Sequence, residues 1–325
     1  MVRMKKNIGV YIGLFLLVLL LAACGGNNES APTNEPAEAT GEQEEIASEK
    51  VVQDAMTDEL VIPANPERII APYLEDSLLA LGITPAAQWS IGESVLDYLQ
   101  PQLADVPKIS WDLPLEQVVS FDPDLVMFSS ASAIQNGLYE EYQKIAPSYV
   151  FTDEASNDWR LQLQTMGELL DKTAEADAAL AEYDEKVVEA KEQINEAIGE
   201  ESAAIIWVMN KQFYVVDETR FSGNVIYGDL EIQAPEFLAS LPDTGDTWDP
   251  VTIEKLSELD ADHIFLLNPE GEMGVDELFA SSVWNDLPAV QADQVYEISD
   301  ASNWTIIGLI ASEQTIDEVV ENLVK

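Results

Sequence analysis

The sequence predicts an α/β fold in which two similar lobes are joined by one long, rigid helix. Three observations support this prediction. Residues 158–199 carry uninterrupted helical periodicity. The segments on both sides alternate strand and helix patterns, and one helix–turn–strand pattern occurs in each of them. We therefore place an N-terminal lobe at 51–157, connecting helices at 158–199 and a C-terminal lobe at 200–325. A long surface helix within a single domain is the alternative.

The connecting helices are predicted from spacing and from end signals. No proline lies between Pro147 and Pro235. Asn157 and Asp158 are candidate N-caps, Thr173 is a second one, and Gly199 is placed to end the helix. The pattern therefore predicts a short helix to Asp171 and a long one from Thr173, which spans about 40 Å at 1.5 Å per residue. Apolar or alanine residues recur three and four positions apart at Met166, Leu170, Ala174, Leu180, Tyr183, Val187, Ala190, Ile194 and Ile198.

An internal repeat links the two lobes. Residues 115–126 and 253–264 share a helix start, an Asp-x-Asp turn and a buried strand at identical spacing. A tryptophan precedes each copy, Trp111 in the first and Trp248 in the second. The repeat favours two Rossmann-like lobes built on one βα plan over a continuous sheet, with a chance similarity as the alternative.

The other elements follow from local patterns. Residues 125–128 are continuously apolar, as in a strand covered on both faces, and Gly82 ends the helix that begins at Leu74. The expected strands are 59–63, 68–71, 125–128, 148–151, 203–209, 213–216, 262–267 and 295–298, with an extended path at 83–86. The expected helices besides the connecting ones are 74–81, 115–120, 138–145, 223–230, 253–256, 282–287 and 315–324.

The N-terminus carries an export signal. Basic residues precede an apolar run at 8–21, which is short for a membrane span. The sequence Leu21-Ala22-Ala23-Cys24 resembles the bacterial lipobox, so we expect a signal peptide at 1–23 and lipid on Cys24. A signal peptide cleaved elsewhere, without lipid, is the alternative. Residues 24–50 are poor in large apolar side chains and are expected to form a disordered tether.

The charge balance excludes one class of partner. The formal net charge is −46, and loss of the three cations of the signal leaves 12 Lys and Arg against 61 Asp and Glu, or −49. Nucleic-acid binding needs a basic surface and is excluded. The imbalance suggests an exterior exposed to high salt or alkaline pH. The roughly 275 residues after the tether are enough for two domains.

The sequence lacks the usual catalytic signatures. The single histidine, His263, lies on a predicted buried strand and is expected in the core, so serine hydrolysis and imidazole-based metal sites have no support. No Walker or dinucleotide glycine pattern occurs. We therefore expect a binding protein without catalytic residues, metal or cofactor other than the lipid. A lipid-anchored envelope enzyme is the alternative of another class.

The tryptophans point to a ligand surface. Trp89, Trp111, Trp248 and Trp304 fall in predicted loops or at element ends, where they would line a cleft between lobes. Trp159 and Trp284 are expected to pack between helices.

Several motifs in order resemble the ferric-siderophore-binding lipoproteins of Gram-positive ABC importers. The resemblance covers about residues 50–325 and implies the class III periplasmic-binding-protein plan, with the ligand in a shallow cleft between two lobes. It also implies a monomer held by its lipid at the extracellular face of the cell membrane, with a ferric siderophore, an ABC permease and the permease's ATPase as partners. The motifs are residues 66–70, 79–85, 121–126, 215–230 and Trp304 before the last helix.

The resemblance also assigns residues. Asp76 with Glu75, and Asp229 in the second lobe, match the acidic residues that family members present to permease arginines. The Ser129–Ser132 loop and Met209 match pocket positions. The positions that match ligand contacts are Tyr73, Trp89, Trp111, Trp207, Arg220, Phe221, Trp248 and Trp304.

The cations near the expected cleft suggest the class of chelate. Only Lys108, Arg160, Lys211 and Arg220 fall near predicted cleft loops. One or two cations suit a neutral or mono-anionic chelate, whereas a ferric tris-catecholate carries about three negative charges. We therefore expect a ferric hydroxamate or citrate-hydroxamate. Haem, cobalamin and a catecholate chelate are the alternatives.

Overall fold

The computed structural model describes residues 49–241, 249–269 and 274–325. The predicted signal peptide, Cys24, nearly all of the tether and Trp248 lie outside these ranges. The described residues belong to one compact unit. None of their helices combines the length and the apolar character that a bilayer span requires.

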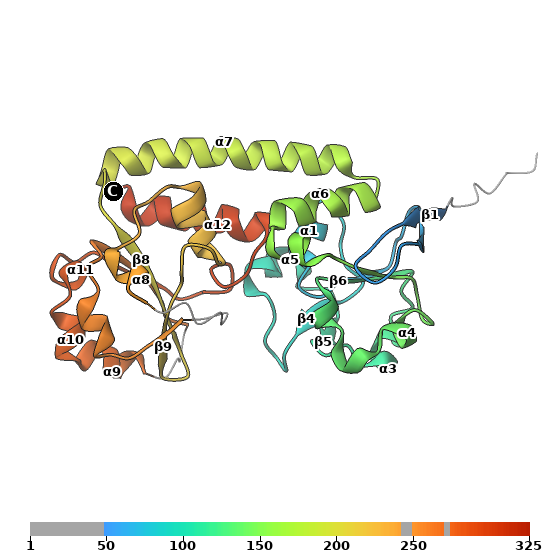
Figure 1. The fold of residues 1–325 in the computed structure, drawn as a ribbon, viewed down its shortest axis with the longest axis horizontal. Coiled ribbons are helices and arrows are strands. Elements are labelled where there is room, and N and C mark those ends of the chain that lie inside the picture. The colour runs from blue at the N-terminus through green and yellow to red at the C-terminus, as the bar shows by residue number, and fades with distance from the viewer. Residues whose placement is uncertain (1–48, 242–248, 270–273) are drawn as a thin grey trace, which may run out of the picture. The chain divides into compact units, whose positions relative to one another are not determined.

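The first sheet is parallel and is built from short buried strands (Figure 1). β3 (Ile69–Ile70), β6 (Leu125–Phe128) and β7 (Ser148–Val150) lie in the order β3-β6-β7. A parallel bridge from Ile70 to Ala87 leads on to the parallel pair β4 (Gln88–Ser90) and β5 (Lys108–Ser110). Separately, β1 (Glu49–Val52) and β2 (Leu60–Pro63) form an antiparallel pair.

Helices cover both faces of this sheet because successive side chains of a strand point to opposite faces. Leu125 and Met127 pack toward α1 and the connecting helices, whereas Val126 and Phe128 pack toward α3 and α4. The helical elements of this half are α1 (Glu75–Ala80), η1 (Asp97–Leu99), α2 (Gln100–Leu103), α3 (Leu115–Ser120), η2 (Ala131–Ala133), η3 (Gln135–Gly137), α4 (Tyr139–Tyr142) and α5 (Asp153–Asn157).

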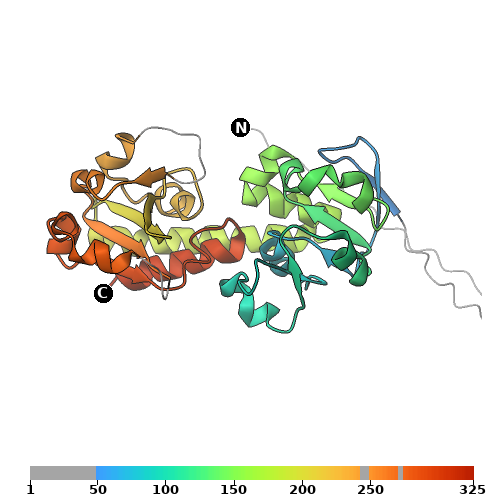
Figure 2. The ribbon, with the colours of Figure 1, turned by 90° about the horizontal axis from the view of Figure 1, so that it is seen from below.

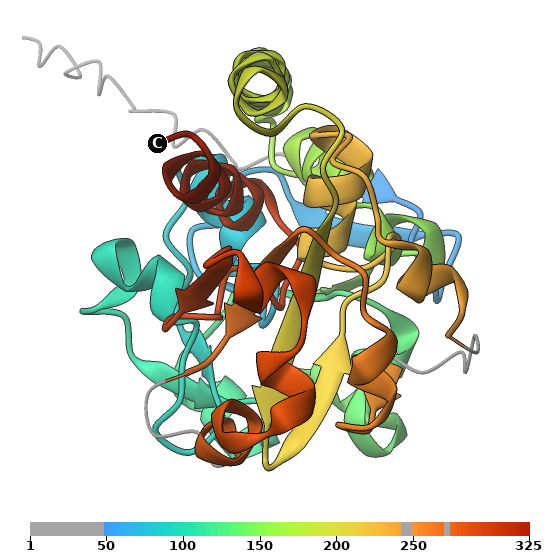
Figure 3. The same cartoon turned by 90° about the vertical axis from the view of Figure 1, so that its left-hand side faces the viewer.

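The second sheet is separate and mixed. Its order is β10-β9-β8-β11-β12, in which β8 pairs antiparallel with β9 and parallel with β11. Figure 3 shows α7 and α12 on one side of this sheet, with α9 and α10 on the other. The strands are β8 (Ala203–Met209), β9 (Gln212–Val215), β10 (Asp249–Val251), β11 (His263–Leu267) and β12 (Val295–Ile298). The helical elements are the π-helix η4 (Asn224–Asp229), α8 (Glu236–Ala239), η5 (Lys255–Glu258), α9 (Val275–Ala280), α10 (Ser282–Asn285) and α11 (Pro288–Gln291).

The long connecting helix is confirmed, as is the α/β class with two sheets. α6 (Trp159–Leu169) and α7 (Thr173–Ile198) follow each other, and α7 runs past both sheets (Figure 2). Asp158 caps α6 by accepting the backbone N–H groups of Arg160 and Leu161, and Gly199 ends α7 with a φ of 62°. The expected cap at Thr173 is wrong, because Thr173 is already helical and Lys172 precedes it without a side-chain cap bond.

One hydrophobic core spans both sheets. It joins Leu125 of the first sheet and Phe265 of the second to Tyr183 of α7 and Ile316 of the C-terminal helix α12 (Leu309–Leu323). α12 packs against α7, α6 and α1. The connecting helix is therefore part of a shared helical layer and is not an isolated rod. The domain limits at 51–157 and 200–325 stay a prediction.

The internal repeat has a structural counterpart in the second aspartate of each turn. The Asp124 carboxylate accepts the backbone N–H groups of Glu67 and Arg68, at the start of β3. The Asp262 carboxylate accepts the backbone N–H of Ser202, at the start of β8. In each half, this aspartate fixes the entry of the neighbouring parallel strand.

Several local expectations differ from the structure. Glu49 and Lys50, expected in the disordered tether, belong to strand β1 and pair with β2. Strands β4 and β5 were not expected, since each is only three residues long and carries polar residues. α12 begins at Leu309 instead of Thr315. Its first turn is stabilised by Asp76, 234 positions earlier in the chain, and no local pattern could have indicated this partner.

Candidate ligand-binding site

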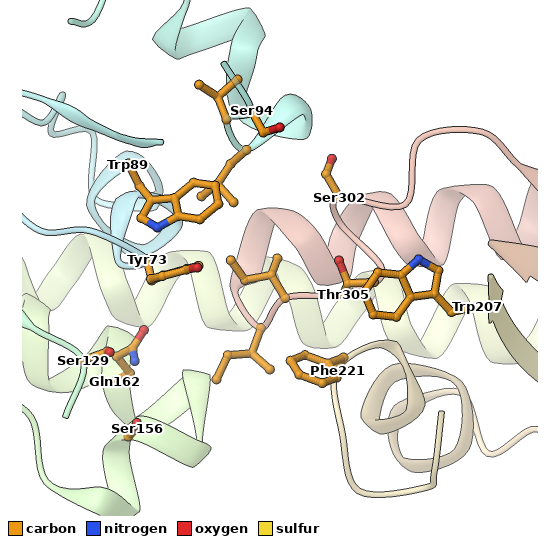
Figure 4. Close-up of a pocket in the computed structure, with 14 residues that line it drawn as sticks. Tyr73, Trp89, Ser94, Ser129, Ser156, Gln162, Trp207, Phe221, Ser302 and Thr305 are labelled. Atoms are coloured by element: carbon orange, nitrogen blue, oxygen red, sulfur yellow. The ribbon is translucent and has the colours of Figure 1, made fainter. Parts of the chain in front are cut away.

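A cavity of about 440 Å³ lies between elements of the two halves (Figure 4). Loops after β3 and β4 form one side, and β8 together with the loop before η4 forms the other. The segment between β12 and α12 contributes a further stretch of wall. The lining residues are Tyr73, Trp89, Ser94, Val95, Leu96, Ser129, Ser156, Gln162, Trp207, Phe221, Ser302, Thr305, Ile306 and Ile307.

Aromatic rings stand on both sides of this cavity. Figure 4 shows Tyr73 and Trp89 on one side, and Trp207 and Phe221 on the other. The Tyr73 and Trp89 rings contact each other, with centroids 4.7 Å apart at 48°. Tyr73 and Phe221 have positive φ angles, 64° and 46°. Bulky residues rarely adopt this conformation, and such strained residues cluster at ligand sites.

Apart from the aromatic residues, the polar part of the lining consists of hydroxyl groups and one amide. Ser94, Ser129, Ser156, Ser302 and Thr305 supply hydroxyls. The buried Gln162 supplies the amide, whose Oε1 accepts the Ser77 hydroxyl at 3.2 Å. Over the residues that the structure describes, no Lys, Arg, Asp or Glu lines the cavity. The surface therefore suits a ligand with apolar faces and hydrogen-bonding oxygens and little net charge.

The four cations expected near the cleft do not line the cavity. Lys108 pairs with Glu93, and Arg220 pairs with Asp217 at 3.2 Å. Arg160 pairs with Asp184 and Asp229, and its guanidinium stacks on the Trp159 and Tyr183 rings. Lys211 is also absent from the lining. Among the described residues, no three His, Cys, Asp or Glu side chains group as metal ligands.

Glu75 is buried next to the aromatic side of the cavity and holds the backbone of Trp89. Its side chain is 0% exposed, and its Oε1 accepts the backbone N–H of Trp89 at 2.7 Å. Burial raises the pKa of the Glu75 carboxyl to about 7. Glu75 cannot contact a permease in this position, so the expected docking role is wrong for this residue.

Asp76 is also buried, at 3% exposure. Its carboxylate accepts the backbone N–H groups of Ile310 and Ala311, and the Tyr98 hydroxyl donates to it at 3.0 Å. Burial raises its pKa to about 6, against the opposing effect of these hydrogen bonds. The expected docking role of Asp76 is therefore wrong as well: the side chain connects α1 to α12.

Asp229 is partly buried and has internal partners. It accepts the Tyr183 hydroxyl at 2.7 Å and pairs with Arg160 at 3.3 Å. This network ties η4 to α6 and α7, so the structure gives Asp229 a bracing role between helices. The docking role expected for it stays a prediction.

Four of the expected ligand contacts meet at the cavity, and the others lie elsewhere. Tyr73, Trp89, Trp207 and Phe221 line it. Trp304 is 0% exposed, packs on Phe265 and donates its indole N–H to Glu318, so its expected place in the cleft is wrong.

Three further positions expected at the pocket have other surroundings. Trp111 is 45% exposed and follows β5 outside the lining. Arg220 precedes Phe221 but faces Asp217, and Met209 is not a lining residue. Within the Ser129–Ser132 loop, Ser129 lines the cavity.

Sequence reasoning missed most of the polar lining. Gln162 could have been identified, because a polar residue on the buried face of a helix, here α6, suggests a functional or hydrogen-bonding role. Ser94, Ser156 and Ser302 carried no such signal, since loop serines are common and only the packing of distant loops brings these together. His263 was expected in the core and is confirmed there, with Tyr296 and Glu201 as partners. Trp159 and Trp284 are buried on helices, as expected.

Comparisons with known proteins agree with this architecture. The chain is 25% identical to the probable siderophore-binding lipoprotein YfiY of Bacillus subtilis, covering 97% of this chain and 98% of that protein. It is 26% identical to the iron(3+)-hydroxamate-binding protein FhuD of the same organism over the whole of both chains. A solved periplasmic binding protein component of a ferrichrome ABC transporter from B. subtilis superposes with a TM-score of 0.70 at 23% identity, covering 84% of this chain and all of that one.

The model of the periplasmic binding protein family matches residues 74–301. This match covers most of the chain: it includes the connecting helices, the second sheet and all of the first sheet except β3. The chain therefore belongs to the periplasmic binding protein family.

Proposed function

We propose that this chain captures an iron(III)-siderophore, of the hydroxamate or citrate-hydroxamate type, in the cavity between its two halves. The observation that carries the proposal is the cavity lining. It consists of two pairs of aromatic rings and several hydroxyls, and none of the described residues contributes a charged side chain to it. Relatives include binding proteins for iron(3+)-hydroxamate and for Fe(3+)-citrate, and a similar solved structure holds ferri-bacillibactin. Similarity to these proteins alone therefore does not indicate which class of chelate this chain binds.

Electrostatics favours a chelate of low net charge. Transfer of a trianionic chelate into an apolar cavity without a cationic partner costs several kcal/mol in desolvation. The formal charge of −46 adds repulsion at long range. A tris-hydroxamate of iron(III) has little net charge, and its hydroxamate oxygens can accept hydrogen bonds from serine and threonine hydroxyls.

A ligand panel tests this proposal. We expect purified protein to show saturable quenching of tryptophan fluorescence with ferrioxamine B or ferrichrome, with a Kd at or below about 1 μM, because Trp89 and Trp207 line the cavity. A catecholate complex, haem and cobalamin should bind at least about 100-fold more weakly. Tight binding of only these last three would contradict the proposal.

We further propose that the mature protein is a monomer tethered by lipid on Cys24 at the extracellular face of a Gram-positive cell membrane. From there it would deliver its ligand to an ABC permease driven by its ATPase. Support comes from the lipobox-like sequence at 21–24 and from the siderophore-binding lipoprotein among the relatives.

Permease docking needs exposed acidic residues, and the internal repeat supplies a matched pair. Glu116, in the first turn of α3, and Glu254, which precedes η5, occupy equivalent positions of the two copies. Both side chains are exposed. α3 and α10 lie on the side opposite α7 in Figure 1, and η5 packs against α10. One acid per lobe on one side of the molecule is the arrangement that we propose for docking, in place of Glu75 and Asp76.

Charge reversal tests the docking pair. Glu116→Arg combined with Glu254→Arg should lower uptake of radioactive ferrioxamine B into cells at least about tenfold, with less than a twofold change in the Kd of the purified protein. The control is Glu185→Arg with Glu189→Arg, two exposed acids on α7, which should leave uptake intact. Normal uptake with the docking variant would refute this assignment.

A further inference from the structure

The segment 302–308 crosses from the second sheet to the helical layer and forms part of the cavity wall. It begins after β12 and leads into α12, and Ser302, Thr305, Ile306 and Ile307 line the cavity (Figure 4). We call residues 302–308 the crossing segment. On the side of the second half, the Trp304 carbonyl accepts the backbone N–H of Ser222, next to Phe221.

Groups of the first half hold both ends of the crossing segment. At its start, the Ser302 hydroxyl accepts the backbone N–H of Tyr98 at 3.0 Å. Just beyond its end, the two Asp76 oxygens accept the N–H groups of Ile310 at 3.0 Å and Ala311 at 2.9 Å. Asp76 thus provides the N-terminal cap that α12 lacks locally, because Gly308 stands at the cap position and has no side chain.

The fit between Asp76 and the crossing segment is close. A Cβ atom added to Gly308 would overlap the Asp76 carboxyl group. Tyr98 donates its hydroxyl to the same carboxylate, while its carbonyl accepts the Gln314 side chain of α12 at 3.3 Å. The bonds to the Asp76 carboxylate are charge-assisted and buried, so each contributes more than a neutral surface bond.

We propose that Asp76 is a positioning residue for ligand binding: it holds the crossing segment against the first half and thereby sets the width of the cavity. Asp76 itself does not line the cavity. Its neighbour Glu75 accepts the backbone N–H of Trp89, another lining residue, so two adjacent residues of α1 fix two parts of the lining of one site. This inference rests on the proposed capture of a ferric hydroxamate in that cavity.

The test compares variants that act on this contact with one that only weakens α12. Asp76→Ala should raise the Kd for ferrioxamine B at least tenfold, mainly through faster dissociation. Asp76→Asn, which keeps one accepting oxygen, should lie between it and the wild type. Gly308→Ala reaches the contact from the other side and should also weaken binding. Val319→Ala, a buried core position of α12 away from the cavity, is the control for lost stability.

Two readouts separate positioning from general destabilisation. Affinity is measured well below the midpoint temperature of thermal unfolding of each variant. Val319→Ala should change the Kd less than twofold, even if it lowers the midpoint temperature as much as Asp76→Ala does. Hydrogen exchange of the Ile310 and Ala311 amides should accelerate in Asp76→Ala without ligand present. Unchanged affinity and exchange in both Asp76 variants would overturn the inference, whereas a wild type that binds no ferric hydroxamate would overturn the proposed function alone.

Discussion

Replacing Tyr73 and Phe221 together with alanine is expected to weaken the binding of ferrioxamine B about 100-fold. The two rings come from opposite sides of the cavity, and Tyr73 is 44% exposed in the absence of ligand, so a bound chelate can cover it. Covering an aromatic ring contributes about 1.5 to 3 kcal/mol, and loss of two partly covered rings costs about 3 kcal/mol of binding free energy. Each single variant should lose about tenfold.

Titration of tryptophan fluorescence checks this result, since the double variant and both single variants retain Trp89 and Trp207 in the cavity. The matched control is Phe279→Ala, which removes an exposed ring of the second half outside the cavity. It should leave the Kd unchanged. A double variant that binds as tightly as the control would show that the ligand lies elsewhere.

Glu75→Gln is expected to flatten the pH dependence of stability. Burial raises the pKa of Glu75 from 4.5 to about 7 in the folded protein. The folded state therefore binds this proton more tightly than the unfolded chain does. The stability that Glu75 contributes is fully present below pH 4.5 and is lost as pH rises through 7, by about 3 kcal/mol in total. Glutamine stays neutral and its oxygen can still accept the Trp89 N–H, so the variant should gain stability at pH 8.

Urea unfolding at pH 5 and pH 8 measures the effect, in about 1 M salt to screen the net charge. Tyr73, Tyr98 and Asp76 are the titratable groups near Glu75, and the pKa values of both tyrosines are raised, above the range of the experiment. Asp76 titrates in both proteins, so the difference between them isolates Glu75. Glu116→Gln, at an exposed site, should match the wild type. An equal pH dependence in wild type and Glu75→Gln would contradict the prediction.

Several elements could be predicted because their signals are local. β6 and β8 were expected with their observed limits, since a continuous apolar run needs no partner to be recognised. The limits of α7 followed from its periodicity and from Gly199. The internal repeat indicated equivalent aspartates, and Asp124 and Asp262 do bind equivalent strand entries.

The errors concern residues whose surroundings come from far along the chain. Trp304 follows a strand near a chain end, which suggested a loop facing ligand, but Phe265 and Glu318 enclose it. Glu75 and Asp76 are charged residues at the start of a helix, a pattern typical of solvent exposure. Tyr98 of η1 and the N-terminus of α12 cover Asp76 instead.

The sequence by itself therefore determined the α/β class, the long helix, the paired halves and the low number of cations available to a ligand. These follow from periodicity, end signals and composition, which act over a few residues or over the chain as a whole. Only the tertiary structure decided which aromatic rings share a cavity, that no charged group among the described residues lines it, and that Asp76 caps α12. The reason is that burial and hydrogen bonding of a side chain depend on segments that pack together across more than 200 residues, as Asp76 and Ile310 do across 234.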